Sequence, residues 1–290
     1  MPLTASPHVD VGVYENRGSL SSSAAPPARR PYFVEEKQGA KITVYWLEKS
    51  RAQRVIWLLE ELKLEYDIQV FKRNKDGRAG PELKKFHPLG RSPTIGITPA
   101  GSDKEIIVTE SETILDYICD HFGPNLIPQR YPAGQEGQLG VETEQWMRHK
   151  FLMDYAEGSF LTPLVVSLIT SGIRAAPVPF FLRPITNGIA NKVDGSYTNP
   201  ELTNHLDFLE TYLKTSPSKG QFFCSDSLTG ADIMIHFALE GAVKKKACTE
   251  SKYPTLYQYV RRLQESDSYK RAGQSVEKAS GEKFVPFSET

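Results

Sequence analysis

The stretch ITVYWLEKSRAQRVIWLLEELKLEYDIQVFK, residues 42–72, contains the pattern that decides the fold. Its beginning, Ile42–Leu47, is rich in β-branched and aromatic residues, which is typical of a buried strand. Ser50 is a favoured helix N-cap, and apolar residues recur behind it at helical spacing as far as Leu62. Tyr66–Lys72 predicts a second strand. Strand, helix and strand in this order favour a parallel βαβ unit.

The next residues extend this unit to a larger sheet. Pro81–Phe86 predicts a short helix with proline at its first position. Thr94–Ile97 and Ile106–Thr109 predict two strands, and their short connection makes them a hairpin. Ser111 caps a further helix that ends near Phe122, before a Gly-Pro pair. The order βαβαββα predicts a thioredoxin-like α/β domain, with helices on both faces of the sheet.

After Pro128 the character changes, and we expect an all-α domain. Gln135–Thr170 predicts one long helix or two, bent at Gly158 and Pro163. The proline-rich residues Ala175–Pro184 predict a turn that leads into another helix. Further helical patterns cover residues 200–214, 229–246, 254–264 and 267–279.

The first forty residues differ from the rest. They include SLSSSAAPPARRP (Ser19–Pro31) and few apolar residues, which predicts a disordered extension. A mitochondrial presequence is the alternative, but such segments are poor in acidic residues and this one has four. We therefore expect an extension at 1–40, an α/β domain at 41–124, a linker at 125–134 and a helical domain at 135–285.

Composition excludes several classes of protein. Lys and Arg together number 35, as do Asp and Glu, so the formal net charge is zero. A chain without net charge has no general electrostatic attraction to phosphate backbones, which argues against a nucleic-acid-binding protein. The cysteines Cys119, Cys224 and Cys248 have no C-x-x-C spacing, which excludes a disulfide framework, a zinc finger and a dithiol redox motif. They fit a reducing compartment, and we expect a cytoplasmic protein.

No apolar run is long enough for a transmembrane helix, which needs about 18 residues. The longest apolar stretch, Phe160–Ile169, is interrupted by Pro163. We expect this stretch to be a buried helix, with membrane association as the alternative.

Three short features carry candidate binding chemistry. Ser50 stands at a strand-to-helix junction, where a hydroxyl and the helix N-terminus could stabilise a thiolate. A cis Ser92–Pro93 bond would free the backbone of Ser92 to pair with a peptide ligand. Glu110 and Ser111, at the start of a helix, could hold the ammonium and carboxylate of an amino acid. Taken singly, each has an ordinary structural explanation, a helix cap or an edge proline.

Together these features match one ligand, an extended tripeptide with a free amino acid at one end, a carboxylate at the other and a thiol between. Over about Lys41–Ala279 the chain resembles the cytosolic glutathione transferases. The segments SRAQRVIWLLEELKLEY (50–66), PELKKFHPLGRSP (81–93) and LTGADI (228–233) are similar to a fungal and bacterial branch typified by a yeast glutathione transferase. Within the last segment, Thr229 and Asp232 match the family's buried capping box.

The resemblance implies roles for the residues that bind glutathione. Pro93 would be the family's cis proline, and Ser92 would pair through its backbone with the cysteinyl residue. Glu110 and Ser111 would hold the γ-glutamyl end. The residues facing the glycyl carboxylate, or the surface beside it, would be Arg91, Arg78 and His87. Arg78 is read equally well as a solvated loop charge, and His87 as a residue that orients its loop.

Two residues compete as activator of the thiol. Ser50 lies five residues after Tyr45, a spacing that resembles the serine-type classes. Tyr45 occupies the position of the catalytic phenol in tyrosine-type classes, but the resembled branch does not keep tyrosine there, so we favour Ser50. Core packing is the other explanation for Tyr45. No cysteine lies in residues 45–51, which disfavours the cysteine-type classes.

The resemblance also implies a hydrophobic cosubstrate pocket. Leu47 would contribute from the first domain, and Phe151, Asp154 and Tyr155 from the long helix. The phenol of Tyr155 would polarise the electrophile. Core or dimer packing is the competing explanation for each of these side chains.

The sequence thus predicts a glutathione transferase that joins glutathione, as cosubstrate, to a small hydrophobic electrophile. The reaction would serve detoxification or secondary-metabolite biosynthesis. A glutathione-dependent peroxidase or isomerase on the same site is one alternative, and a non-catalytic glutathione-binding regulatory protein is another. The chemistry requires no metal and no nucleotide. Members of the family are usually dimers, and we expect a homodimer.

Overall fold

The computed structural model describes residues 38–289. The predicted extension, and with it the presequence alternative, lies outside the described residues except for its last three positions. Ala40, counted in that extension, already belongs to the first strand.

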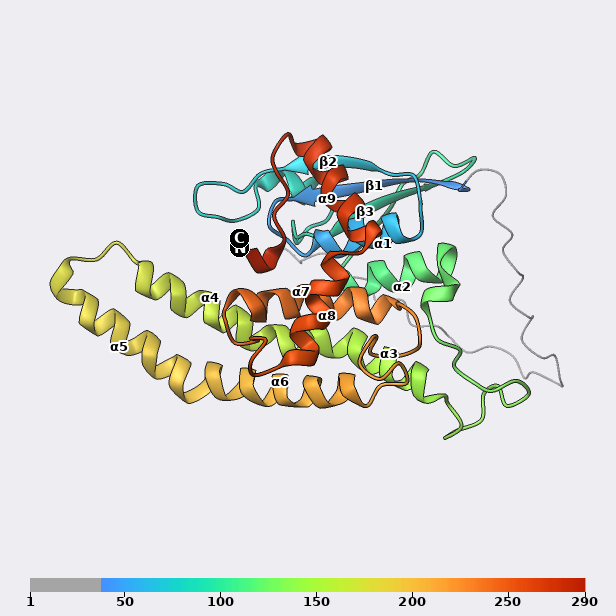
Figure 1. Ribbon diagram of the computed structural model, residues 1–290. Coiled ribbons are helices and arrows are strands. Elements are labelled where there is room, and N and C mark those ends of the chain that lie inside the picture. Colours follow the sequence, from blue (N-terminus) through green and yellow to red (C-terminus); the bar gives the residue numbers. More distant parts are fainter. Residues whose placement is uncertain (1–37, 290) are drawn as a thin grey trace, which may run out of the picture. The chain divides into compact units, whose positions relative to one another are not determined.

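A four-stranded sheet forms the first half of the described chain, with strand order β2-β1-β3-β4 (Figure 1). The central strand β1 (Ala40–Leu47) runs parallel to β2 (Asp67–Phe71) and antiparallel to β3 (Thr94–Pro99). The edge strand β4 (Ile106–Thr109) pairs antiparallel with β3. The predicted βαβ unit and the predicted hairpin are both confirmed.

Two helical segments connect these strands, and a third follows the last strand. Helix α1 (Ala52–Glu61) joins β1 to β2, and α2 (Ser111–Phe122) follows β4. The predicted short helix between β2 and β3 is a 3₁₀ turn, η1 (Pro81–Lys85). The order βαβαββα is therefore confirmed, but Arg51, and not Ser50, is the N-cap residue of α1.

Strand β1 contributes to two hydrophobic clusters because its side chains alternate between the faces of the sheet. Val44 and Trp46 join the main core, which runs through α1 and α2 into the helical half. Tyr45 and Leu47 point to the opposite face and pack with Leu83 of η1. The end of β1 is therefore enclosed on both faces.

The second half of the described chain is helical, as predicted. Helix α3 (Glu144–Tyr155) continues through a π-helical turn, η3 (Ala156–Phe160), into α4 (Leu161–Ala175). The turn η3 includes Gly158, one of the two predicted bend positions.

The predicted start of the long helix at Gln135 is wrong. Gly137 and Gly140 have positive φ angles of 79° and 83°, which a right-handed helix does not allow. The helix begins only after Thr143, whose hydroxyl caps it by accepting a hydrogen bond from the Trp146 amide at 3.2 Å.

The remaining helices fold back along the core. Helices α4 and α5 form a hairpin that extends from the rest of the described chain, and α9 returns to lie beside α1 and β2 (Figure 1). The last turn, η6 (Phe287–Glu289), packs against α7. The helical segments between α4 and η6 are η4 (Phe180–Leu182), α5 (Arg183–Val193), η5 (Asp194–Thr198), α6 (Asn199–Lys214), α7 (Gly230–Lys244), α8 (Pro254–Gln264) and α9 (Asp267–Ser280).

The capping box predicted from Thr229 and Asp232 is present at the start of α7. One oxygen of the buried Asp232 carboxylate accepts the Thr229 amide at 2.9 Å, and the other accepts the Phe223 amide at 2.9 Å. The Tyr259 hydroxyl also donates to Asp232, at 2.8 Å. The carboxylate thus ties α7 to α8 and to the preceding loop, which is a folding role.

The helical stretch Glu144–Ala175 is long and apolar enough to cross a membrane by length and composition, with 33% of its most apolar part buried. The core helix of a soluble protein passes the same test. Phe160 and Leu164 are buried, whereas Val165, Leu168 and Ile169 are 46%, 54% and 59% exposed. The expectation of a buried helix over Phe160–Ile169 therefore holds for one face of the helix only.

Candidate functional site

The register of the sheet brings the three predicted features to one end. Leu47 at the end of β1 lies on the side where β3 begins, because Val44 pairs with Ile95 in an antiparallel register. Thr94 at the start of β3 faces Thr109 at the end of β4. The loops that carry Ser50, Ser92–Pro93 and Glu110–Ser111 consequently leave the same edge of the sheet.

Ser50 is buried in the loop between β1 and α1. Its Oγ accepts the Ala52 amide at 3.2 Å, so the side chain still supports the start of α1. The same atom lies 3.1 Å from the Oγ of Ser92. Ser50 lines both of the cavities described below.

The Ser92–Pro93 peptide bond is cis, as the resemblance implies. The hydroxyl of Thr94 donates to the carbonyl of Arg91 at 2.8 Å and closes the loop around this bond. Ser92 is buried and also lines the larger cavity.

Glu110 and Ser111 form an unusual junction between β4 and α2. Glu110 has a φ of 70°, a left-handed conformation that is rare for residues other than glycine and costs about 1–3 kcal/mol. It is the N-cap residue of α2, so Ser111 is the first helical residue and not the cap that was predicted. The buried Ser111 Oγ has no hydrogen-bond partner within residues 38–289. Backbone strain of this kind clusters at functional sites, but neither Glu110 nor Ser111 lines the two cavities described below.

The larger cavity has a volume of about 940 Å³ and lies between the sheet half and the helical half. Five predicted site residues line it, namely Leu47, Ser50, Arg78, Arg91 and Ser92. Its other wall comes from α4 and α7, with Leu161, Leu164 and Phe237 among the lining side chains. These helical residues were not predicted, since an apolar side chain on an amphipathic helix carries no signal that separates pocket from core.

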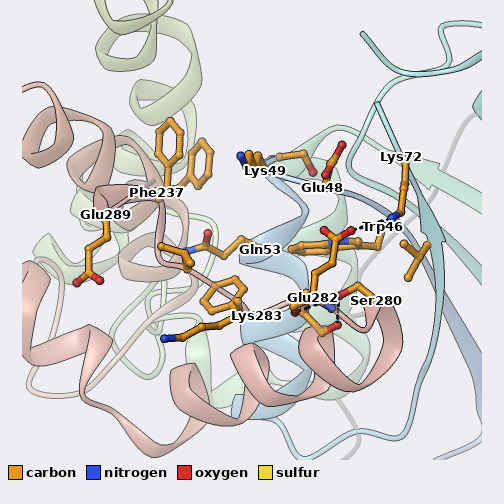
Figure 2. Close-up of a pocket in the computed structure, with 16 residues that line it drawn as sticks. Trp46, Glu48, Lys49, Gln53, Lys72, Phe237, Ser280, Glu282, Lys283 and Glu289 are labelled. Atoms are coloured by element: carbon orange, nitrogen blue, oxygen red, sulfur yellow. Dashed lines mark hydrogen bonds and ion pairs between the residues drawn. The ribbon is translucent and has the colours of Figure 1, made fainter. Parts of the chain in front are cut away.

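The smaller cavity, of about 270 Å³, adjoins Ser50 on the side of α9. Figure 2 shows Phe237 of α7 and Ser280 of α9 among the side chains that line it. Trp46 and Gln53 line it from β1 and α1, and the chain after α9 covers it. The Phe287 ring stacks on Phe237 with centroids 4.5 Å apart and planes inclined by 7°. Lys72 also pairs with Glu282 of this terminal segment at 2.7 Å. The C-terminal segment is therefore a wall of the site that sequence analysis missed.

Tyr45 is held away from both cavities. Its hydroxyl donates to the two carboxylate oxygens of Glu105 at 2.9 and 3.0 Å, and its ring stacks on Phe86 at 3.8 Å. Burial, together with the Glu105 carboxylate, raises the pKa of Tyr45 well above its usual value. The phenol keeps its proton and donates it in a hydrogen bond to the Glu105 carboxylate.

Phe151, Asp154 and Tyr155 do not line either cavity that contains Ser50. The Tyr155 hydroxyl lies 2.6 Å from Nδ1 of His205 on α6, and its ring stacks on Phe151 at 4.9 Å. Asp154 pairs with Lys150 at 3.5 Å. Side chains about two turns further along the same continuous helix line the cavity instead. These three side chains therefore pack between helices or lie at the surface.

His87 and Arg78 occupy the two loops beside the larger cavity. His87 does not line it, and its Nδ1 accepts the Leu89 amide at 3.4 Å, which matches the alternative role of orienting the loop. Arg78 does line the cavity, and its backbone amide is fixed by the Asn74 side chain at 2.9 Å.

A partly buried ion cluster lies beneath the start of α1. Arg51 and Arg54 both pair with Glu157 of η3, and the Arg54 side chain is only 1% exposed. Burial by itself would raise the pKa of Glu157. The guanidinium groups of Arg54 and Arg51 outweigh burial and hold this pKa below its usual range. Because Arg51 also lines the larger cavity, this cluster connects the site to the turn between α3 and α4.

Residues 38–289 contain no group of three or more His, Cys, Asp or Glu side chains that could hold a metal ion. Cys119, Cys224 and Cys248 are buried and unpaired. Burial raises the pKa of the Cys119 thiol to about 12, so it stays protonated.

Comparison with known proteins decides the family. The family models for the N-terminal and C-terminal domains of glutathione S-transferases match residues 50–121 and 184–271. Glutathione S-transferase 1 of Saccharomyces cerevisiae is 32% identical over 84% of this chain and 98% of that protein. The chain belongs to the glutathione S-transferase family.

Solved structures of glutathione transferases share the fold of this transferase. A homologue from Lodderomyces elongisporus, solved with two glutathione molecules per subunit, has a TM-score of 0.58 and 18% identity, and covers 80% of this chain and 97% of that one. A transferase from Phanerochaete chrysosporium with oxidized glutathione has a TM-score of 0.60 and 16% identity, and covers 86% and 99% of the two chains. The thioredoxin-like domain followed by an all-α half is thus the architecture of the family.

Proposed function

We propose that this transferase joins glutathione to a small hydrophobic electrophile, and that Ser50 stabilises the glutathione thiolate. The observation that carries the proposal is the position of the Ser50 hydroxyl, which borders both cavities and meets the Ser92 hydroxyl beside the cis proline. In this proposal residues 41–124 form the glutathione-binding domain, 125–134 the linker and 135–285 the helical domain.

Glutathione would lie along the end of the sheet. The backbone of Ser92 would pair with its cysteinyl residue, which would bring the sulfur toward Ser50. Glu110 and the unsatisfied Ser111 hydroxyl would hold the γ-glutamyl end. Arg91 and Arg78 would face the glycyl carboxylate, as both guanidinium groups belong to residues that line the larger cavity.

The chemistry then follows from the donor at Ser50. A free thiol has a pKa of about 8.5, and lowering it by one unit takes about 1.4 kcal/mol. A hydrogen bond to a charged group contributes about 1.5–3 kcal/mol, and a helix N-terminus about 0.3–1 kcal/mol. Together they would hold a large share of bound glutathione as thiolate at neutral pH. The sulfur electron pair would form a bond to the electrophilic carbon, whose leaving group would depart with its own bonding pair.

A titration of glutathione into the purified protein near neutral pH tests this mechanism through the absorbance of the thiolate. We expect the signal in the wild type and in Tyr45→Phe, and its loss in Ser50→Ala. Loss in Tyr45→Phe alone would transfer the role to Tyr45. A wild type that binds glutathione but transforms neither aryl halides nor peroxides would be a non-catalytic binding protein. Turnover of peroxides alone would favour the peroxidase alternative.

We also propose a homodimer in the cytosol. Dimers are usual in the family, and exposed apolar side chains on the α4–α5 hairpin, such as Leu168, Phe180 and Ile185, are surface that a second copy could cover. Light scattering should give about twice the chain mass of 32.5 kDa. Cell fractionation should find the protein in the soluble fraction. Recovery with membranes would instead favour a membrane role for Glu144–Ala175.

A further inference from the structure

The two cavities beside Ser50 share a border. Their linings have four residues in common, namely Lys49, Ser50, Phe237 and Phe287. The first two belong to the loop between β1 and α1, and the two phenylalanines belong to α7 and η6. Figure 2 shows Lys49 and Phe237 facing each other at this border. The border thus consists of one loop from the sheet half and one pair of aromatic rings from the helical half.

The two aromatic rings at the border lie flat against each other, with centroids 4.5 Å apart and planes inclined by 7°. Phe237 is buried and Phe287 is half-buried. Neither of them belongs to the two hydrophobic clusters that form the core of the described residues. Their stack is therefore an apolar contact outside the core, made where the two cavities meet.

Helix α7 has room for the ring of Phe287. Gly241 follows Phe237 by about one helical turn and lines the larger cavity. A Cβ atom at Gly241 would lie only 3.1 Å from Cε1 of Phe287. Glycine inside a helix is less favourable than alanine by about 1 kcal/mol. Here the missing side chain allows the ring to approach the helix closely, so α7 receives Phe287 through both Phe237 and Gly241.

Contacts on both sides of Phe287 hold the segment that carries it. Before it, the amide of Phe284 donates to the carboxylate of Glu277 on α9 at 2.9 Å. After it, the hydroxyl of Ser288 accepts a hydrogen bond from the side chain of Gln264 on α8 at 2.8 Å. The position of the ring therefore does not depend on the stack alone. A change at Phe287 leaves these two contacts of the segment in place.

The ring of Phe287 limits the space beside the sulfur of a bound glutathione. In the proposed function glutathione occupies the sheet side of the larger cavity, so the electrophile has the space between Ser50 and the helical wall. Leu164 and the pair of phenylalanines bound this space. Flat aromatic faces pack well on an aromatic ring, which favours an aromatic electrophile. Beyond the pair lie the further 270 Å³ of the smaller cavity.

We propose that Phe287 is a specificity-determining residue, which limits the electrophile to a single aromatic ring by separating the smaller cavity from the larger one. This inference rests on the proposed transferase function, because it names the residue that selects among electrophiles at the same site. An electrophile with a second fused ring would extend to the place of the Phe287 side chain. It would bind only if that ring moved off Phe237 and Gly241.

Two electrophiles that differ in one fused ring test the inference, 1-chloro-2,4-dinitrobenzene and 1-chloro-2,4-dinitronaphthalene. In both reactions the sulfur of the glutathione thiolate forms a bond to the carbon that carries chlorine, and chloride leaves with the bonding electron pair. For each compound, kcat/KM is divided by the rate constant of the uncatalysed reaction with glutathione, which removes their different intrinsic reactivity. We expect the wild type to prefer the single ring by about tenfold or more.

Variants locate the effect. Phe287→Ala joins the two cavities and should lower the preference for the single ring by about fivefold or more. Phe287→Leu, which keeps an apolar contact with α7, should lower it by a smaller factor, and Phe287→Trp should raise it. Phe181→Ala is the matched control, because Phe181 is 64% exposed and lines neither cavity, and it should keep the wild-type ratio. Thermal unfolding of each variant verifies that it is folded.

The outcomes separate the inference from the function on which it rests. If the wild type conjugates both compounds without preferring the single ring, or if the Phe287 variants keep the wild-type ratio, the inference is overturned and the transferase function stands. If Phe287→Ala lowers the activity with both compounds by the same factor, the ring supports the site without selecting the substrate, which also overturns the inference. If neither compound is conjugated, the proposed function fails and the inference fails with it.

Discussion

The Oγ atoms of Ser50 and Ser92 lie 3.1 Å apart, so a single hydrogen bond joins the loop after β1 to the loop before β3. A hydroxyl of Ser92 that donates to Ser50 leaves the hydrogen of Ser50 directed to a bound ligand. Ser50 Oγ also accepts the Ala52 amide, which fixes its position at the start of α1. The serine pair thus lies at the border of both cavities, because Ser50 lines each of them.

The first prediction concerns this pair. Ser92→Ala removes the hydroxyl that orients Ser50 but keeps the backbone that would bind glutathione. A neutral hydrogen bond contributes about 0.5–1.5 kcal/mol, so the pKa of the bound glutathione thiol should rise by about 0.5–1 unit. The thiolate absorbance against pH measures this shift. Ser92→Thr, which restores a hydroxyl, should return the thiol pKa toward that of the wild type, and an unchanged pKa in Ser92→Ala would refute the orienting role.

The second prediction separates Tyr45 from catalysis. Tyr45→Phe removes the hydrogen bonds to Glu105, which should lower the free energy of unfolding by about 1 kcal/mol. The pKa of bound glutathione should stay unchanged, because the phenol lies outside both cavities. Urea unfolding and the thiolate titration provide the two readouts. A raised thiol pKa in a stably folded Tyr45→Phe protein would contradict this view.

The third prediction concerns the buried Arg54. Glu157→Gln removes the charge partner of a guanidinium that is almost completely inaccessible to water. Breaking a buried pair from one side costs about 3–5 kcal/mol, because the other charge stays buried without compensation. Glu282→Gln, in the exposed pair with Lys72, is the matched control and should cost less than about 1 kcal/mol. Similar midpoints of urea unfolding for the two variants would show that Arg54 finds another partner.

The fourth prediction is an acid-dependent loss of stability. Burial, and after it the charge of Lys150, lowers the pKa of His149 to about 4, against about 6.5 in an unfolded chain. The unfolded state therefore binds the proton more readily between these values. The free energy of unfolding therefore has its full value, as far as His149 is concerned, above pH ~6.5. It decreases as the pH falls toward 4, by up to about 3 kcal/mol.

Urea unfolding at pH 7 and pH 4.5 tests the histidine. His149→Phe should lose less stability between the two pH values than the wild type, by about 2–3 kcal/mol. His121→Gln, at an exposed position of α2, should behave like the wild type. Equal losses in the wild type and in His149→Phe would mean that His149 does not cause the acid sensitivity.

The predicted and observed helix boundaries show where local patterns suffice. The strands of the sheet and the capping box of Thr229 and Asp232 were correct, because hydrophobic periodicity and capping are properties of neighbouring residues. The start of the long helix was misplaced because no residue between Gln135 and Glu144 interrupts it as strongly as proline does. Only the backbone showed that Gly137 and Gly140 adopt left-handed conformations there.

The helical wall of the larger cavity could not be predicted for a similar reason. Tyr155 and Leu164 are both apolar or aromatic residues of one long helix, yet the first packs on His205 and the second lines the cavity. Which turn meets the sheet depends on how the helices cross, and this depends on side chains far apart in the chain. The stack of Phe287 on Phe237 joins residues 50 positions apart and has no local pattern.

The sequence by itself determined the order of strands and helices, the family, and the loops that carry Ser50, Ser92 and Glu110. The order of strands and helices follows from short-range periodicity, caps and turns, in which each residue acts on its near neighbours, whereas the family and the site loops follow from the resemblance of whole segments to known glutathione transferases. Only the tertiary structure decided that Tyr45 faces Glu105 and that α4, α7 and the C-terminal segment enclose Ser50. Only the tertiary structure, too, showed that lysines from both halves of a chain without net charge line one cavity. Burial and local charge depend on residues that folding brings together from distant parts of the chain.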